Sequence, residues 1–240
     1  MAPRTTETDV AHVAAAIGEP SRAKVLLALA GGGALPASAL AAEAGVGNST
    51  ISGHLAKLLD AELLTVELDG RHRYYRLATT DVARALEQLA RIARPLPVDS
   101  LNADTRAKAL LRARLCYDHL AGRLGVALMS ALLADGVLAA EPDPAGPDAA
   151  YVLTAHGHRE PTAFGVDTER LPHRRATVRY CVDWGERRHH LAGALGAAVT
   201  TRMFACAWLR RGRYRRVVHL TDAGREGLTA TFGVPADDLV

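Results

Sequence analysis

The sequence predicts a mainly α-helical protein with small β-hairpins, an α+β fold built in two parts. The chain has 240 residues, of which 49% are hydrophobic and 23% charged, so it can bury a core and is not disordered as a whole. Apolar residues recur at helical spacing through much of the chain, and short alternating segments interrupt them. Pro95 and Pro97 punctuate the chain between two helical runs. We place a domain boundary there, which gives domains 1–96 and 97–240.

Helices and one hairpin are expected in a fixed order in the first domain. The second helix follows Glu19-Pro20-Ser21, a capping sequence with proline at an early position, and the third ends at Gly45. The pair Asp69-Gly70 favours a two-residue turn between two alternating segments. The predicted helices are 9–17, 21–30, 36–44, 48–60 and 80–93, and the predicted strands are 63–68 and 72–77. Helices joined by a tight glycine turn and followed by a hairpin predict a winged helix-turn-helix.

The helix at 48–60 has two different faces. Val46, Ile51, Leu55 and Leu58 lie at the spacing of a buried face, whereas the opposite face is short and polar and includes Gly53. Small polar side chains can approach base edges in DNA. The alternative is a solvated helix beside a charged hairpin. We expect bases to be contacted by Ser49, Thr50, Ser52 and His54, and phosphates by Lys57, Arg71, His72 and Arg73.

Overall charge gives little support to DNA binding. The formal net charge of the chain is +3, and residues 1–96 carry ten basic and ten acidic side chains. Glu67 and Asp69 in the predicted wing lower its affinity for phosphate further. DNA binding therefore has to arise from where the charges are placed and not from their sum.

Several classes of protein are excluded by simple observations. No apolar stretch approaches the roughly 18 residues of a membrane span, and the first ten residues lack an apolar signal core, so we expect a cytoplasmic protein without membrane contact. Three scattered cysteines do not make a disulfide scaffold. Gly31–Gly33 lacks the residues of a phosphate loop, and a cysteine nucleophile beside His119 or His190 is the weakest alternative. We predict that the chain is not an enzyme.

The first domain resembles a known family. Two of its segments are similar to segments of the ArsR/SmtB transcriptional repressors. They read IGEPSRAKVLLAL and LAAEAGVGNSTISGHLAKLLDAELLTVELDGRHRYYRL. The resemblance covers residues 9–93 and depends on three motifs taken together. These are S-x-x-S-x-H-L-x-x-L, then A-x-L-L, and a G-R wing that ends in Y-R-L. The resemblance implies a homodimer, joined by the first and last helices of this domain, that binds double-stranded operator DNA with twofold symmetry.

The metal sites common in that family are missing from this sequence. Members often carry paired cysteines on the helix before the recognition helix, and the segment 36–44 has none. Others carry Asp and His two residues apart on the last helix, but here Asp81 is followed by Val82 and Ala83, and that helix has no histidine. The resemblance therefore implies no metal ion.

The second domain contains an internal repeat. HLAGRLGVAL at 119–128 matches HLAGALGAAV at 190–199, and LTAHGHREPTAFGV at 153–166 matches LTDAGREGLTATFGV at 220–234. We predict two related helix–hairpin–helix repeats at about 112–171 and 180–239. The repeated small residues indicate a mutual helix crossing or two separate tight contacts. These residues are Ala121, Gly122, Gly125, Ala192, Gly193 and Gly196.

Candidate effector residues cluster around the start of the two repeated HLAG segments. Thiolate, imidazole and carboxylate groups are ligands of zinc-like ions, and the clusters would converge if the repeats packed about a local twofold axis. Trp184, in a polar neighbourhood, is a candidate for the pocket of an organic effector. The other candidates are Cys116, Asp118, His119, Cys181, Asp183, His189 and His190.

Several roles for the second domain remain open on sequence alone. It could bind a transition metal or a small molecule that releases the repressor from DNA, use Cys116 and Cys181 as a redox switch, or serve as an oligomerisation platform without a ligand. The sequence therefore leaves the cofactor unknown, with a transition metal and no cofactor as the alternatives. The arginine-rich run Arg210–Arg216 fits either DNA phosphates or a solvated hairpin.

Overall fold

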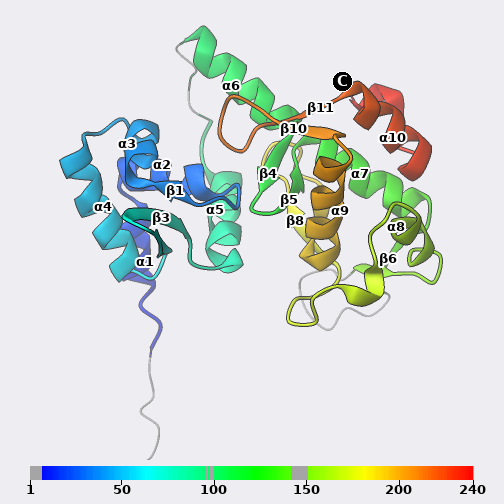
Figure 1. Cartoon of the computed structure of the whole chain (residues 1–240), viewed down its shortest axis with the longest axis horizontal. Helices are drawn as coiled ribbons and strands as arrows, with labels where there is room; N and C mark the ends of the chain where they lie inside the picture. Colours follow the sequence, from blue (N-terminus) through cyan, green and yellow to red (C-terminus); the bar gives the residue numbers. More distant parts are fainter. Residues whose placement is uncertain (1–6, 96, 98–99, 142–150, 240) are drawn as a thin grey trace, which may run out of the picture. The chain divides into compact units, whose positions relative to one another are not determined.

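The structure is a computed structural model that describes residues 7–95, 97, 100–141 and 151–239. It divides into two compact units, unit 1 at Met1–Leu86 and unit 2 at Glu87–Val240 (Figure 1). Among the described residues, no helix is long and apolar enough to cross a membrane. The mixed helix and strand content confirms the predicted fold class.

Unit 1 has the predicted order of helices around a small antiparallel sheet. The sheet has the strand order β1-β3-β2, with β2 at Leu64–Asp69 and β3 at His72–Leu77. The strand β1 at Leu35–Pro36 was not predicted, because two residues that include a proline carry no strand pattern. The helices are α1 (Val10–Ile17), α2 (Pro20–Leu29), α3 (Ala37–Ala44), α4 (Asn48–Asp60) and α5 (Thr80–Ile92).

Local interactions set the ends of these helices. The Glu19 carboxylate accepts hydrogen bonds from the backbone N–H groups of Ser21 and Arg22, at 3.1 and 2.8 Å, and so begins α2. The buried Arg22 side chain donates to the carbonyls of Ala16 and Ala15, at 2.6 and 2.8 Å, near the end of α1. Gly45 has a φ of 75° and ends α3 in the left-handed conformation that glycine favours.

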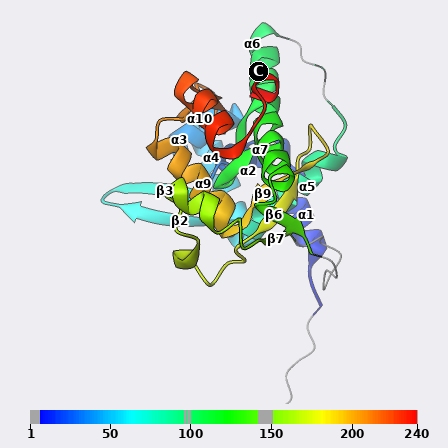
Figure 2. The same ribbon diagram turned by 90° about the vertical axis from the view of Figure 1, so that its right-hand side faces the viewer.

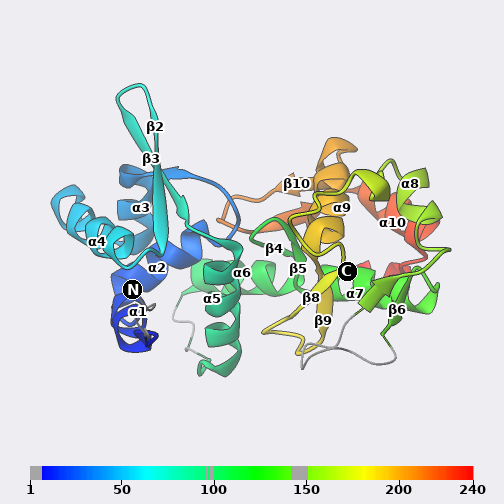
Figure 3. The same ribbon diagram turned by 90° about the horizontal axis from the view of Figure 1, so that it is seen from below.

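The wing is a long two-stranded hairpin. Asp69 pairs with His72, so the loop consists of Gly70 and Arg71, and Gly70 has a φ of 56°. The hairpin projects away from the helices of unit 1 in two perpendicular views (Figures 2 and 3). Its tip is therefore exposed to solvent and open to a partner.

The two units meet along the chain within α5. The predicted boundary at 96/97 lies after this helix, whereas the units divide at 86/87. Glu87 lies in unit 2, where its buried carboxylate pairs with Arg114, at 3.3 Å, and with Arg216. The domain limits 1–96 and 97–240 stay a prediction.

After the end of α5, unit 2 continues with α6 (Leu101–Arg112). It then shows the same succession of elements twice in the described residues: a hairpin, a helix, a second hairpin, a helical segment and a 3-10 turn. The first succession is β4 (Arg114–Cys116), β5 (His119–Ala121), α7 (Arg123–Ala134), β6 (Leu138–Ala140), β7 (Tyr151–Leu153), α8 (Arg159–Ala163) and Thr168–Arg170. The second is β8 (Arg179–Val182), β9 (His189–Ala192), α9 (Gly193–Ala205), β10 (Leu209–Arg211), β11 (Val218–Leu220), α10 (Asp222–Phe232) and Ala236–Leu239.

The repeated HLAG segments are strands followed by helices, and not helices throughout as predicted. Ala121 ends β5 and Ala192 ends β9. Gly122, which directly precedes α7, and Gly193, the first residue of α9, have positive φ values of 79° and 82°, which glycine adopts without strain where strand passes into helix. Each succession therefore starts with a hairpin. That the two are related repeats remains a prediction.

Gly125 and Gly196 bring helices close to strands. A Cβ atom on Gly125 would lie 2.5 Å from the carbonyl oxygen of Leu120 and 3.5 Å from the Cβ of His190. On Gly196 it would lie 2.8 Å from the carbonyl oxygen of Leu191 and 3.4 Å from the Cβ of His119. The expected helix–helix crossing at these glycines is therefore corrected: α7 packs on β9, and α9 packs on β5.

A continuous apolar core joins both halves of unit 2. Phe164 and Phe232, at equivalent places in the two successions, have ring centroids 5.1 Å apart. Helices α7, α9 and α10 supply many of the remaining core residues. Its members include Leu124, Leu128, Met129, Leu132, Leu195, Val199, Met203 and Leu228.

We predict that Gly125→Ala and Gly196→Ala destabilise unit 2, because the added methyl group meets a backbone carbonyl that cannot move alone. The expected loss is about 1–3 kcal/mol, as for other overpacked cores. Urea unfolding of the full chain measures it. Gly33→Ala is the control, since a Cβ there has no neighbour within 4 Å, and an equal change in all three variants would contradict the prediction.

Candidate nucleic-acid interface and buried Cys/His cluster

Helix α4 divides into a buried face and an exposed face. Ile51, Leu55 and Leu58 are at most 1% exposed and pack into unit 1. The other face offers short polar side chains and a glycine to solvent. The exposed residues named from the sequence are Ser49, Thr50, Ser52 and Lys57, with Gly53 between them.

His54 lies differently from its neighbours. Its side chain is half-buried, and its Nδ1 is 3.4 Å from the Oε2 of Glu19. Because Glu19 caps α2, His54 joins the start of that helix to α4. The structure thus places His54 against its own unit, whereas the sequence suggested a place near bases.

The wing exposes the basic residues expected at its tip. Arg71, His72 and Arg73 are all exposed. The Glu67 carboxylate, which we expected to weaken phosphate binding, pairs with the guanidinium of Arg76 at 3.0 Å. Part of the negative charge of the wing is therefore compensated within the hairpin.

A second group of candidate residues converges inside unit 2. Cys116 faces His119 across the β4–β5 hairpin, and Cys181 faces His190 across the β8–β9 hairpin. All four side chains are buried, and their potential ligand atoms lie within 4.8 Å of one another. The two imidazole rings are stacked with centroids 5.2 Å apart. We call these four residues the Cys/His cluster.

Asp118 lies behind His119. Its Oδ1 is 3.1 Å from the Nδ1 of His119, and the carboxylate also binds the half-buried guanidinium of Arg175. Burial acts to raise the pKa of Asp118, but the hydrogen bonds from His119 and Arg175 outweigh it and lower the pKa to about 2. Burial also acts to lower the pKa of His119, yet Cys116 and Asp118 raise it to about 9.

Asp183 takes a similar place beside His190 but has more partners. Its Oδ2 accepts a hydrogen bond from the N–H of Gly122 at 2.7 Å and pairs with the guanidinium of Arg114 at 2.8 Å. Its Oδ1 accepts from two backbone N–H groups of the β8–β9 loop. The Nδ1 of His190 is 3.9 Å from Oδ2, which is too long for a hydrogen bond.

Three ring nitrogens of the Cys/His cluster have no hydrogen-bond partner among the described residues. The Nε2 of His119 and both ring nitrogens of His190 are buried without a hydrogen-bond partner among the described residues. Burial, together with the charges of His119 and Arg114, holds the pKa of His190 well below its usual range. The hydrogen bond with Cys181 and burial raise the pKa of the Cys116 thiol. These sulfur and nitrogen atoms could hold a metal ion.

Trp184 and His189 lie outside the cluster. The guanidinium of Arg114 stacks over the Trp184 ring at 4.5 Å. The Nδ1 of His189 is 2.7 Å from the hydroxyl of Tyr151, and its ring stacks on Tyr180 at 4.1 Å. Of the eight effector candidates from the sequence, four converge, two carboxylates stand behind them, and these two rings make other contacts.

Unit 2 also contains a small basic pocket that the sequence did not predict. The pocket has a volume of about 170 Å³. No motif pointed to it, because its lining comes from segments far apart in the chain. The lining includes Arg112, Arg123, His219, Arg225, Asp238 and Leu239.

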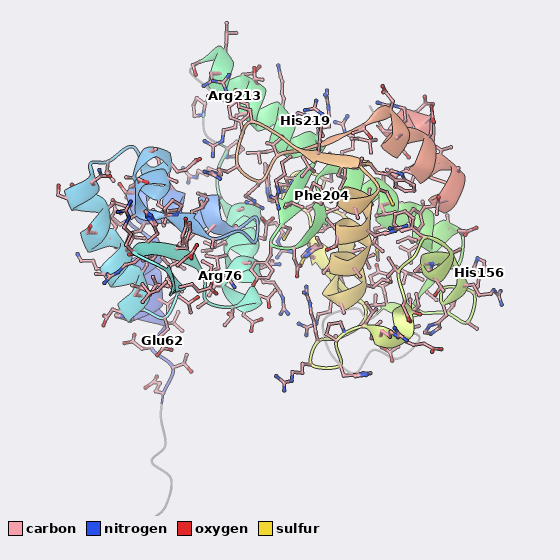
Figure 4. The ribbon with its side chains drawn as sticks, in the orientation of Figure 1. Glu62, Arg76, His156, Phe204, Arg213 and His219 are labelled. Atoms are coloured by element: carbon pink, nitrogen blue, oxygen red, sulfur yellow. The ribbon has the colours of Figure 1, made fainter. Side chains whose placement is uncertain are left out.

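The arginine-rich run 210–216 is divided between structural and exposed positions. Arg216 is mostly buried, donates from Nε to the carbonyl of Leu115 at 2.9 Å, and pairs with Glu87. Arg211 stacks over the ring of Phe204 at 5.4 Å. Arg213 is exposed in the loop between β10 and β11 (Figure 4). The run is therefore partly a packing element of unit 2.

Comparison with known proteins relates the chain to regulators of transcription. A family described as a helix-turn-helix domain matches residues 17–67. The uncharacterized HTH-type transcriptional regulator YdfF of Bacillus subtilis (strain 168) is 40% identical over 218 residues, which cover 90% of this chain and 94% of that protein. The HTH-type transcriptional regulator CmtR of Mycobacterium tuberculosis (strain H37Rv) is 33% identical over 93 residues, or 39% of this chain and 78% of CmtR.

Solved structures also match part of the chain. The NMR structure of the cadmium metal-sensor CMTR from Mycobacterium tuberculosis is 32% identical, covers 38% of this chain and 94% of that chain, and has a TM-score of 0.32. In contrast, the likeness to the Bacillus regulator extends over nine-tenths of the chain. The relationship to that regulator therefore includes much of unit 2.

Proposed function

The chain belongs to the family of helix-turn-helix transcriptional regulators, with an ArsR/SmtB-type winged helix and an additional C-terminal domain, and we propose that it is a cytoplasmic repressor. In this proposal a homodimer binds an inverted-repeat operator, and an effector sensed by the C-terminal domain releases it. The alternative is that the C-terminal domain is an oligomerisation platform without a ligand.

The DNA-binding part of this proposal rests on one observation, which is that α4 has a buried face and an exposed face. Its apolar residues fix the helix to unit 1, so the exposed residues can enter a major groove without unfolding anything. The projecting wing adds Arg71 and Arg73 for phosphates. Because the total charge of residues 1–96 is balanced, affinity has to come from these few local contacts.

Exposed apolar residues support a homodimer. Val10 and Val13 of α1 are 68% and 37% exposed, although this helix is almost entirely apolar. Leu89 and Ile92 of α5 are also exposed, by 42% and 75%. Exposed apolar side chains on a helix favour burial against a partner. A second copy of the chain is the partner we propose for them.

Features of unit 2 support a sensing role. It offers a small pocket with a basic lining, which could take a ligand. An effector changes DNA affinity only if it binds the free and DNA-bound forms unequally. Helix α5 provides a covalent connection, because its residues continue from unit 1 into unit 2.

Charge and sequence recognition are expected to separate by mutation. Lys57→Ala and Arg71→Ala should weaken binding to all DNA sequences, and each should lower the salt slope by about 1 because one phosphate is no longer neutralised. Ser49→Ala and Thr50→Ala should instead change base preference at defined operator positions. Fluorescence anisotropy with operator and scrambled DNA at several salt concentrations measures both effects.

The matched controls for the charge variants are Lys108→Ala and Arg170→Ala, which remove exposed charges of unit 2. The proposed interface would be refuted if the DNA affinity of the unsubstituted chain did not depend on salt concentration. It would also be refuted if that chain showed no preference for an inverted repeat. Controls that weaken binding as much as Lys57→Ala would move the interface away from α4.

Gly53 provides a test in which stability and function change in opposite directions. It is exposed in the interior of α4, and a Cβ there meets nothing within 4 Å. Gly53→Ala should therefore stabilise the chain by about 0.5–1 kcal/mol, because glycine is a poor helix former. If DNA approaches this face closely, the same variant binds operator more weakly. A variant that is more stable and binds equally well would exclude close approach at Gly53.

Truncation after Pro95 tests the division of labour between the domains. Residues 1–95 should bind operator DNA, and this binding should not respond to any compound that releases the full chain from DNA. Compounds are first selected from a panel of metals and metabolites by their stabilisation of the full chain against heat. Since the partners of Glu87 are removed by truncation, a second truncated form carries Glu87→Gln. A truncated form that still responds would place the sensor in the first domain.

A further inference from the structure

The two leading hairpins of unit 2 present matching sets of side chains to one another. Each hairpin contributes one cysteine and one histidine from directly opposed positions. In the first hairpin a two-residue loop joins them, and Tyr117 in that loop has a φ of 62°, which is unusual for a residue with a side chain. The strands β5 and β9 lie beside each other, so the two pairs converge.

The spacing of the Cys/His cluster suits one small ion. In a tetrahedral zinc site with Zn–S distances near 2.3 Å and Zn–N distances near 2.0–2.1 Å, neighbouring ligand atoms are about 3.3–3.8 Å apart. Here all four ligand atoms lie within 4.8 Å of one another, so small side-chain movements bring them to that geometry. A two-iron cluster would hold the cysteine pair and the histidine pair on different irons, further apart.

We propose that Cys116, His119, Cys181 and His190 bind one Zn²⁺ ion in a closed site that fastens the two hairpins of unit 2 together. Two sulfur and two nitrogen ligands in a compact arrangement are the donor set of structural zinc. The cysteines bind as thiolates, and their protons pass to solvent. Since all four positions are filled by buried side chains, no place remains for a substrate or a reactive water.

The partnerless nitrogens favour a metal ion over a disulfide and over a charged thiolate–imidazolium pair. A disulfide between Cys116 and Cys181 would leave the Nε2 of His119 and both nitrogens of His190 buried without partners. A thiolate–imidazolium pair of Cys116 and His119 would still leave His190 unsatisfied. A buried polar atom without a partner destabilises the folded state, because it has lost its hydrogen bonds to water. One Zn²⁺ ion would satisfy a nitrogen of each ring and both sulfurs at once.

The surroundings are those of a metal site whose ligands are held in place. The Oδ1 of Asp118 lies 3.1 Å from the Nδ1 of His119, which leaves Nε2 to face the cluster. Arg175 fixes that carboxylate in turn. Such carboxylate–histidine pairs orient zinc ligands and set their tautomer. The Oδ2 of Asp183 is 3.9 Å from His190, in the corresponding position on the other hairpin.

This site is separate from the proposed DNA interface. All its residues lie in unit 2, outside the helix-turn-helix match at 17–67. The proposal therefore does not rest on the proposed function. Metal content and operator binding are measured separately, so the failure of one proposal is distinguishable from the failure of the other.

Metal analysis of the purified full chain is the first test. After reconstitution with ZnCl₂ under reducing conditions and removal of excess ion, we expect about one Zn²⁺ per chain. Cys116→Ser and Cys181→Ser should each lose most of it. Cys206→Ser, the remaining cysteine, and His189→Gln, next to a proposed ligand, should keep it. No bound zinc in the unsubstituted chain, or equal loss in the control variants, would overturn the proposal.

A second test uses the unsubstituted chain and so does not depend on the folding of variants. Replacement of zinc by Co²⁺ should give the visible spectrum of tetrahedral cobalt together with thiolate-to-cobalt charge transfer. Chelation should lower the thermal midpoint by several degrees, and ZnCl₂ should restore it, because the ion binds only the folded state. Octahedral cobalt, a midpoint that ignores chelation, or a Cys116–Cys181 disulfide that persists under reducing conditions would overturn the site.

Discussion

The fully buried guanidinium of Arg114 sets the arrangement of much of unit 2. A buried charge is costly unless ion pairs and hydrogen bonds compensate it. Here Glu87 approaches from α5 and Asp183 from the β8–β9 hairpin, and the Trp184 ring lies against the guanidinium. Segments that are far apart in the chain are thereby brought to β4, the strand that carries Cys116. The position of the Cys/His cluster depends on this network as much as on its own residues.

The sequence predicted unit 1 well because its signals are local. Capping at Glu19, the glycine turn at Gly45 and the apolar spacing in α4 each act within a few residues. The exceptions are the two-residue strand β1 and the orientation of His54, and both depend on partners elsewhere in the fold. The strands in the repeated HLAG segments escaped prediction because strands of three or four residues have no recognisable period.

The four residues of the Cys/His cluster were among the candidates predicted from the sequence, but the sequence did not predict their relative positions. Cys116 and His119 are three residues apart, whereas Cys181 and His190 are nine apart. What makes the pairs equivalent is that each faces its partner across a hairpin, and loop length does not affect that relation. Spacing alone therefore could not separate these four residues from Asp118, Asp183, Trp184 and His189. The basic pocket had no sequence signal at all.

The reciprocal packing of unit 2 has a consequence for synthesis on the ribosome. Helix α7 rests on β9 and α9 rests on β5, so the first half of the unit stays incomplete until the second half has emerged. About 80 residues separate β5 from the end of α9, which corresponds to roughly 4–16 s of translation. Unit 1, whose contacts are nearer in sequence, can fold before that interval begins. The nascent chain therefore carries a folded N-terminal domain at a time when the apolar side chains of α7 are not yet buried by the second half of unit 2.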